Sequence, residues 1–592
     1  MSTTSTTDQE TESDTSDSGA PSGGDFDPVA ARRAARRGLI LGGLAVAATA
    51  CNVRPDPPRT INPPAPPRPR PTTTLPPRTT TTLPRTTTTL PRTTSTTTTS
   101  TVPPTTPPPT TNPPTPPTAL RAEHVARRLT FGPTPAVMSA IAAAGGPAQW
   151  IDAQLEMPAS VDAALDDQIR SSYPRTFNDA IGNFALGEAW EIISELPAAT
   201  TVRAIFAQRQ LFEQTVGFFW DHFNVDLRND RAQASCGAYD QLIRAGAFGR
   251  FSDLLLAVAR SAAMMNYLNQ ATSRADGTNV PVENFARELM ELHTVGVDGG
   301  YDEDDVKAVA HLLSGWTRQL VDWMPIGPFR FDAAAHNLGP FQDPTHTVLG
   351  WSRGALTGEA AGVGFIDHLA RHPTTAQRLA HELAIRFIGD HVQRDDAVVT
   401  AAAGVYLTND TSIRATLRSL LTSNEFAASA NRRIRRPLEL YASMVRALAR
   451  PTWNPGALRD ARWGLVGATD SLNQVPHWWP DPDGYPDRDA NWVSVGSMIS
   501  RWNMATWVVR SPSAVVTVDW TAIRNWTTGT TIGEWFAAAC GRLGVTVANT
   551  ARDRMLGELY RTATTPLSAT GTQWTMENLL IQLLQAPDYQ TR

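Results

Sequence analysis

Residues 283–301 read ENFARELMELHTVGVDGGY, and they set the helical pattern that runs through much of the chain. Phe285, Leu289 and Leu292 recur at four- and three-residue spacing, which places them on one face of an α-helix. Gly296 follows this pattern, and glycine is the residue that most often ends a helix. We therefore predict an amphipathic helix that ends before Gly296 and buries one apolar face.

The same helix carries a polar stripe with two carboxylates. At about 100° per residue, Asn284, Glu288 and Glu291 lie within about 60° of one another. His293 lies on the opposite side, so a regular helix cannot turn both glutamates and this histidine toward one metal ion. The stripe is either half of a functional site that another element completes, or a surface on which Arg287 and Glu291 form an ion pair.

Apolar residues recur at helical spacing along nearly the whole second part of the chain. Asp302 and Asp305 resemble a capping box, and Pro373 occupies a favoured first helical position. Residues 319–350 are instead rich in Trp, Phe, Pro and Gly, and they predict a small irregular or β-hairpin insertion. We predict an all-α fold, with one large multi-helix domain over residues 119–592. Helices are expected over residues 120–144, 200–223, 250–268, 282–295, 303–315, 374–388, 410–421, 433–449, 550–562 and 575–586.

The first part of the chain predicts export. Arg36 and Arg37 precede thirteen mostly apolar residues and then Cys51. This run is too short for a membrane-spanning helix, which needs about 20 residues, but it suits a signal peptide. We expect residues 36–51 to act as a twin-arginine-like export signal that ends in a lipobox-like cysteine. Lipidation of Cys51 would tether the protein to the membrane, whereas plain cleavage would release it.

Two low-complexity segments flank this signal. Residues 1–35 are acidic and predict a disordered tail. Residues 52–118 are rich in Pro, Thr and Arg, and seven Arg and one Asp after residue 52 give a net charge of 7 − 1 = +6. Such a segment cannot bury apolar surface, so we predict a disordered, extended spacer that holds a domain away from the membrane.

Several blocks of the second part of the chain resemble a bacterial family. Besides the segment quoted first, they are ARRLTFGP at 126–133, FWDHFNV at 219–225, LSGWT at 313–317, HNLG at 336–339, RPLEL at 436–440, and Trp492 with RWN at 501–503. They make the chain similar to the family named domain of unknown function 1800, although Val282 and Asn337 depart from its usual Asn and Asp. The resemblance implies an exported, mostly helical bacterial protein without an established activity.

Two histidines could complete a site with the polar stripe. His222 lies in a run of aromatic residues, where a histidine is either a core residue or a buried ligand. His336 lies in an irregular Gly/Pro-rich segment, where functional groups gather. Two carboxylates and an imidazole suit zinc, manganese or iron, and they also suit acid–base catalysis. The candidate catalytic residues are therefore Glu288, Glu291, His222 and His336, with a divalent metal ion as the candidate cofactor.

A second candidate cation site lies in the segment DPDGYPDRD. Four aspartates surround one glycine there, namely Asp481, Asp483, Asp487 and Asp489. Carboxylates at this density are typical ligands of Ca²⁺, although the segment lacks the final glutamate of an EF-hand loop. Aspartate and glycine also form ordinary turns, and this alternative stays open.

Tryptophan and arginine are concentrated in the same late region. Exposed tryptophan rings could stack on sugars, whereas buried ones would pack between helices. The arginines at 432–436 suggest a solvated helix start. The tryptophans are Trp453, Trp463, Trp478, Trp479, Trp492, Trp502 and Trp507.

Composition and missing motifs exclude several function classes. The net charge is −5, so no basic field predicts nucleic-acid binding. Lys307 is the only lysine, and the chain has no GxxxxGK(S/T), CxxC or HExxH motif. We therefore expect no nucleic-acid and no nucleotide partner. Cys236 and Cys540 could form a disulfide in an exported protein, and the sequence leaves this open.

Two functions fit the sequence. The first is a binding or assembly module at the cell wall, tethered to the membrane through Cys51 and bound to envelope components. The alternative is a metal-assisted or acid–base hydrolase of wall polymer or glycan, so the sequence leaves open whether the protein is an enzyme. An enzyme needs its candidate side chains to converge in one cleft. A binding module would instead show an exposed aromatic patch, with its carboxylates engaged in ion pairs.

Overall fold

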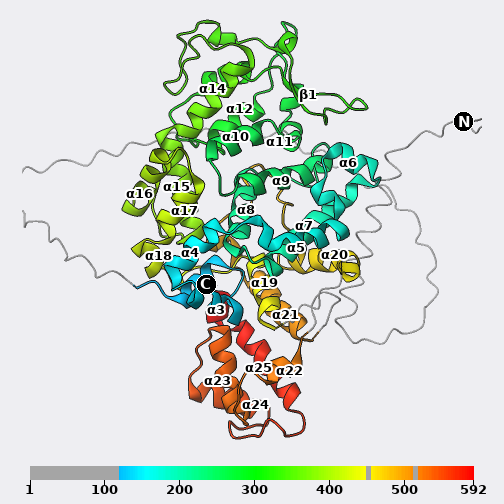
Figure 1. The fold of residues 1–592 in the computed structure, drawn as a ribbon, viewed down its shortest axis with the longest axis vertical. Coiled ribbons are helices and arrows are strands. Elements are labelled where there is room, and N and C mark those ends of the chain that lie inside the picture. The colour runs from blue at the N-terminus through cyan, green and yellow to red at the C-terminus, as the bar shows by residue number, and fades with distance from the viewer. Residues whose placement is uncertain (1–118, 449–454, 511–517) are drawn as a thin grey trace, which may run out of the picture. The chain divides into compact units, whose positions relative to one another are not determined.

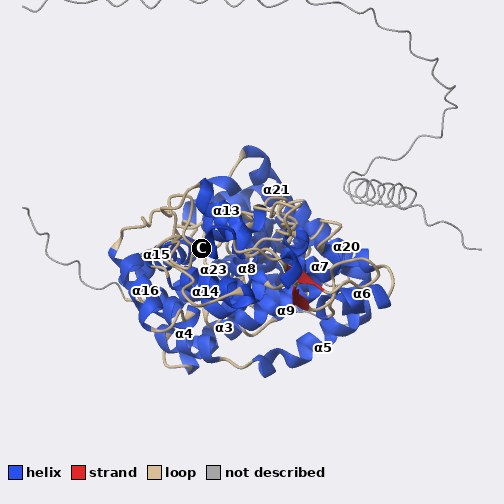
Figure 2. Ribbon diagram, turned by 90° about the horizontal axis from the view of Figure 1, so that it is seen from above, coloured by secondary structure: helices blue, strands red, loops and turns tan. Residues whose placement is uncertain are grey.

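The computed structural model describes residues 119–592 except 449–454 and 511–517, and the described residues belong to one compact unit. Helices dominate the described residues, and their sheet is one two-stranded hairpin (Figures 1 and 2). The prediction of an all-α fold with a small β-hairpin is therefore confirmed.

The predicted leader lies outside the described residues. This holds for the acidic tail (1–35), for the export signal (36–51) with Arg36, Arg37 and Cys51, and for the spacer (52–118). None of the helices in the described part of the chain has both the length and the apolar character needed to cross a bilayer.

The helices follow one another along the chain in the order labelled in Figure 1, and their bounds are given in three groups. The first group is α2 (Ala122–Leu129), α3 (Pro135–Ala143), α4 (Pro147–Glu156), α5 (Ala163–Ser172), α6 (Ala180–Ala185), α7 (Ile192–Phe206), α8 (Gln210–His222), α9 (Cys236–Gly246), α10 (Phe251–Ala259) and α11 (Ala262–Tyr267). The second is α12 (Asn284–Glu291), α13 (Glu303–Leu312), α14 (Gly358–Arg371), α15 (Pro373–Phe387), α16 (Ala397–Thr408), α17 (Ile413–Leu421) and α18 (Asn424–Ala428). The third is α19 (Pro437–Leu448), α20 (Pro455–Asp470), α21 (Val495–Arg510), α22 (Trp520–Arg524), α23 (Ile532–Leu543), α24 (Asn549–Glu558), α25 (Thr572–Gln585) and α26 (Pro587–Gln590).

Glycine and proline divide the first predicted helix in two. The segment expected as 120–144 forms α2 and α3, because Gly132 has a φ of +125° and Pro133 follows it. A Cβ on Gly132 would lie 2.8 Å from the Cβ of Ser443, so this close approach to α19 also requires glycine. The expected capping box is confirmed, since Asp302 and Asp305 cap α13 reciprocally.

Helix α12 is shorter than the predicted 282–295. It ends at Glu291, after which the N–H of His293 donates to the carbonyl of Glu288 and the N–H of Gly296 donates to that of Met290, both at 2.9 Å. Gly296 has a φ of +91°, which closes this turn. The turn carries His293 into the core, where it is buried.

The hairpin lies between α13 and α14. Strands β1 (Trp316–Arg318) and β2 (Phe329–Phe331) are antiparallel, with Trp316 opposite Phe331. Trp316 is fully buried and anchors the hairpin to the main core, whereas the loop between the strands extends outward (Figure 1).

Two large apolar cores hold the described helices together. The first is built mainly by α2–α4 and α8–α18, and the second by α5 and α19–α25. Helix α7 joins them, because Ile192 and Leu196 belong to the first core while Val202 and Ile205 belong to the second. The last helices, α22–α25, form a lobe of their own in Figure 1.

Candidate functional site

His222 is held at the end of α8 by two hydrogen-bond acceptors. Its Nδ1 lies 2.9 Å from Oε2 of Glu382, and its Nε2 lies 3.2 Å from the carbonyl oxygen of His293. A carboxylate and a carbonyl both accept, so an imidazole with a proton on each nitrogen satisfies both contacts. Burial alone would raise the pKa of Glu382, but the positive charges of Arg378 and His222 outweigh it and hold this pKa below its usual value. Neither ring nitrogen of His222 is free for a metal ion in this arrangement.

Glu288 and Glu291 share the half-buried face of α12, as the helical spacing predicted. Neither carboxylate accepts a hydrogen bond within the described residues. Burial raises the pKa of Glu288, and the negative charges of Glu291 and Asp483 raise it further. Glu288 is thus a carboxyl that keeps its proton more readily than an exposed glutamate does.

The proposed ion pair between Arg287 and Glu291 does not form. Arg287 instead pairs with Glu283 at 3.3 Å and with Glu303 at 2.6 Å. Glu283 lies one turn before Arg287 on the same face, and Glu303 begins α13, which packs beside α12. The guanidinium is therefore drawn away from Glu291.

His336 lies in the loop that follows the hairpin. Its Nδ1 donates to the carbonyl oxygen of Ser314 at 2.9 Å, its Nε2 is buried without a partner in the described residues, and burial lowers its pKa. Its ring packs against Phe331. Within the described part of the chain, no contact joins His336 to His222, Glu288 or Glu291. The structure thus brings the two glutamates together on one helix and places the two histidines in separate surroundings.

The four aspartates of the predicted calcium site turn toward different partners. Asp483 accepts a hydrogen bond from Nε1 of Trp479 at 2.8 Å, and Asp487 pairs with Arg386 at 2.6 Å. Asp489 pairs with Arg433, whereas Asp481 contributes its backbone carbonyl to the side chain of Asn224. In the described ranges, no group of three or more His, Cys, Asp or Glu residues is arranged to hold a metal ion.

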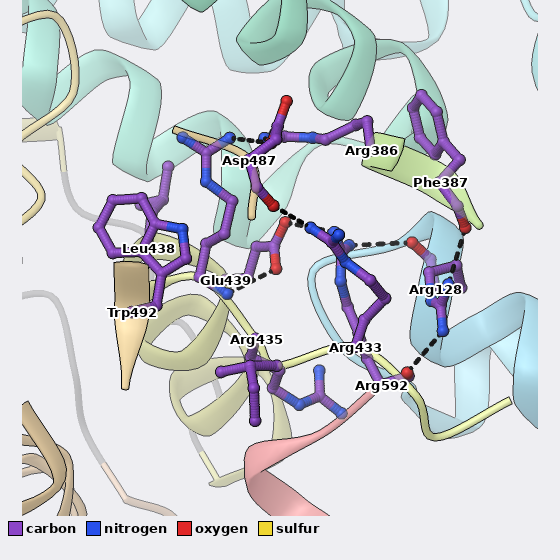
Figure 3. A network of polar contacts seen from close by, with 12 residues as sticks. Arg128, Arg386, Phe387, Arg433, Arg435, Leu438, Glu439, Asp487, Trp492 and Arg592 are labelled. Carbon is purple, nitrogen blue, oxygen red and sulfur yellow. Dashed lines mark hydrogen bonds and ion pairs between the residues drawn. The ribbon is translucent and has the colours of Figure 1, made fainter. Parts of the chain in front are cut away.

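Three of the four late arginines are buried rather than solvated, whereas Arg432 is exposed. Arg433, Arg435 and Arg436 are each at most 2% exposed, and they join a larger group that we call the arginine network (Figure 3). Its members are Arg128, Arg386, Arg433, Arg435, Arg436, Arg501 and Arg592, with the carboxylates of Asp221, Asp390, Asp487, Asp489 and Glu439. The sequence reasoning missed this network, although RPLEL is one of the family-like blocks and contains two of its members.

Two aspartates neutralise the centre of the arginine network. Arg436 reaches Asp221 at 2.8 Å and Asp487 at 3.2 Å, and Arg386 shares Asp487 with it. Burial raises the pKa of Asp221, and the charge of Arg436 opposes this rise. A cavity of about 50 Å³ adjoins these groups, and Arg244 and Glu213 pair at 2.6 Å on its wall. Its size suits water rather than a substrate.

Backbone carbonyls satisfy other arginines of the network. Arg128 donates to the carbonyls of Phe387, Ile388, Ser429 and Arg592 at 2.6–2.8 Å, and two of these bonds are drawn in Figure 3. Arg128 thereby links α2 to the ends of α15 and α18. The arginine network therefore acts as structural cross-linking between distant segments.

A group of exposed apolar side chains lies on two segments that meet in the fold. We call it the apolar patch, and its members come from two neighbouring segments: Ile181, Phe184, Leu186 and Trp190 from α6 and the following 3-10 helix η3 (Ala189–Glu191), and Leu320, Trp323 and Met324 from the hairpin loop. A small buried cluster with Ala180 and Ile326 joins these segments. Trp323 is 92% exposed and has a φ of +67°. Figure 1 shows the hairpin loop extending near α6.

The late tryptophans do not form one surface. Trp492 is buried beside Arg436, whereas Trp463 and Trp502 are about two-fifths exposed on different helices. Trp453 lies outside the described residues. Both remaining cysteines are free, with Cys236 buried and Cys540 partly exposed, so they do not form a disulfide in this structure.

Comparison with known proteins gives a family and no activity. No curated protein matches the chain, and no solved structure does. The family described as "Protein of unknown function (DUF1800)" matches residues 124–591, which cover nearly all of the described helices. Because this match spans well over half of the sequence, the chain belongs to the DUF1800 family.

Proposed function

We propose that this protein is an exported module, tethered to the cell envelope, that binds a cell-wall component through the apolar patch. The apolar patch is the observation that carries the proposal. Exposed apolar side chains scattered singly are ordinary, but a group from two adjoining segments marks an interaction surface. Trp323 and Trp190 offer large rigid rings, which contribute much contact area at a low entropic cost.

Two further features support a binding function. Many carboxylates around His222 and in the arginine network are engaged in ion pairs, as Asp221, Asp487 and Glu382 illustrate. The leader predicted from the sequence would carry the domain to the envelope, where wall polymer is the most abundant partner. Its twin-arginine-like motif and Cys51 supply the export and tethering parts of the proposal.

Co-sedimentation with isolated bacterial cell walls tests the binding function. We expect the purified protein to sediment with the walls and Trp323→Ser to reduce the bound fraction severalfold, because the substitution removes the most exposed ring of the apolar patch. Adding Trp190→Ser should reduce binding further.

Tyr560→Ser is the matched control for this experiment. Tyr560 is 93% exposed and lies between α24 and α25, away from the apolar patch in sequence and structure. The control variant should sediment like the wild type. Equal binding of the Trp323→Ser and wild-type proteins, or equal losses in both variants, would refute a role for the apolar patch.

Hydrolysis of wall polymer is the second candidate function, and the environment of Glu288 favours it. A carboxyl with a raised pKa and no hydrogen-bond partner in the described residues is suited to donate a proton to a leaving group. Glu291 supplies a second carboxyl on the same face. We infer that an enzyme of this type would use Glu288 as its acid.

Release of soluble fragments from isolated walls tests this alternative. Glu288→Gln should abolish release, whereas Glu303→Gln, an exposed glutamate of α13, should leave it unchanged. Elemental analysis of the purified protein, with Glu288→Ala as the comparison, tests whether a metal ion takes part. No release by the wild-type protein would reject the hydrolase and leave the binding module.

A further inference from the structure

A pocket of about 310 Å³ lies between the end of α19 and the helices α22 and α23. Leu448 and Ile523 provide apolar wall, and Trp526 provides an aromatic ring. The polar lining groups are Asn525, Arg542 and Asp519, whose carboxylate caps α22 by accepting from the N–H of Ala522. This volume falls in the range of small-molecule sites, which begins at about 300 Å³. The pocket is separate from the apolar patch and from the candidate residues on α8 and α12.

Arg542 is the unsatisfied group in this pocket. It forms no hydrogen bond and no ion pair within the described residues. The side chain is half-buried, and its Nε is buried without a partner. Its guanidinium lies over the ring of Trp526, with Cζ 4.6 Å from the ring centroid. Burial lowers its pKa.

Arg542 differs from the buried Arg436 and Arg128 of the arginine network, whose terminal nitrogens have partners in the protein. Arg436 pairs with two carboxylates, and Arg128 donates to four backbone carbonyls. A guanidinium has five N–H groups in a fixed fork, and the protein supplies no acceptor for those of Arg542 within the described residues. A bound anion would supply the missing acceptors, and a carboxylate fits the fork with two parallel bonds.

We propose that this pocket binds a small organic carboxylate. The carboxylate pairs with Arg542, which Trp526 holds in place from the opposite side. The apolar part of the ligand contacts Leu448 and Ile523, and this wall favours an organic acid over a bare inorganic anion. The ligand is either a free organic acid or the carboxyl end of a peptide, because both present the same group.

Calorimetric titration of the wild-type protein with matched probes tests the proposal. Benzoate represents a free acid, N-acetylalanine represents a peptide end, and benzamide and N-acetylalaninamide are their uncharged counterparts. We expect at least one acid to bind in a saturable way and its amide to bind about tenfold more weakly or not at all, since a charge-assisted pair is lost. The acid that binds with the higher affinity identifies the source of the ligand: benzoate indicates a free organic acid, and N-acetylalanine indicates a peptide end.

Variants locate the site. Arg542→Gln should weaken binding of the acid about tenfold or more, Arg542→Lys should weaken it less, and Arg552→Gln should leave it unchanged. Arg552 is the control because it lies on the neighbouring helix α24 and pairs with Asp553 at the surface. Circular dichroism and thermal melting establish that each variant is folded.

Three results would overturn the inference. They are no saturable binding of either acid, equal binding of an acid and its amide, or unchanged binding in the folded Arg542→Gln protein. Binding of inorganic phosphate alone would also reject the organic carboxylate. None of these results bears on wall binding by the apolar patch, so the two proposals fail separately.

Discussion

Glu288 lies half-buried beside Glu291, and its carboxyl has no hydrogen-bond partner in the described part of the chain. Its raised pKa means that the folded protein binds this proton more tightly than the unfolded chain does. Ionised Glu288 therefore reduces the stability of the fold. The reduction begins as the pH rises through the unfolded value and is complete above the folded pKa.

Replacing Glu288 with glutamine should remove this cost. We expect Glu288→Gln to increase the free energy of unfolding at pH 7.5 by about 1 kcal/mol or less, because the carboxyl is only half-buried. The gain should vanish at a pH below about 4, where the carboxyl is protonated in both states. Urea denaturation at both pH values measures this difference.

Glu303→Gln is the opposite case on the neighbouring helix. The hydrogen bond from Arg287 lowers the pKa of Glu303, so this carboxylate stabilises the fold above its unfolded pKa. Its replacement should therefore lower stability slightly at pH 7.5. A loss of stability in Glu288→Gln at that pH would contradict the environment described for Glu288.

At the scale of elements, periodicity located helices well and located their ends poorly. The spacing of Phe285, Leu289 and Leu292 correctly indicated a helix, yet α12 stops at Glu291. The turn depends on hydrogen bonds to the carbonyls of Glu288 and Met290, which no periodic pattern records. Gly296 was the available signal, and its left-handed backbone draws the preceding residues out of the helix.

Gly296→Ala should therefore destabilise the end of α12. A residue with a side chain pays about 1–2 kcal/mol for a left-handed backbone, and the new Cβ would lie 3.2 Å from Cδ of Arg378. We expect the free energy of unfolding to fall by roughly that amount, with the same denaturant dependence. Gly404→Ala, inside the exposed face of α16 with open space around it, should instead raise stability by about 0.5–1 kcal/mol. Equal effects at both glycines would show that Gly296 is not needed for the turn.

At the scale of the whole molecule, the sequence predicted the fold class but not the contacts that unite distant segments. Helical periodicity depends on residues three and four apart, so it revealed the all-α architecture. The arginine network joins residues hundreds of positions apart, and an arginine in a buried network looks like an exposed one in a sequence. For the same reason the sequence pattern predicts solvated side chains for Arg433 and Arg436, which are buried in the structure. The apolar patch was missed because it arises only where α6 meets the hairpin loop.

Arg128 provides the sharpest test of this long-range organisation. It is fully buried, and its side chain satisfies carbonyls from three separate parts of the chain, represented by Phe387, Ser429 and Arg592. Arg128→Met keeps much of the volume but removes every donor, so those buried carbonyls lose their partners. We expect a loss of about 3–5 kcal/mol and a lower thermal midpoint, measured by calorimetry.

The control for this prediction lies about two helical turns away. Arg121 precedes α2, is exposed and forms no side-chain hydrogen bond in the described residues. Arg121→Met should change stability by no more than about 0.5 kcal/mol. If Arg128→Met proved equally mild, the network would be dispensable, and the two apolar cores joined by α7 would suffice to hold the distant segments together. A large loss confined to Arg128→Met would show instead that buried hydrogen bonds, as well as apolar packing, hold this fold together.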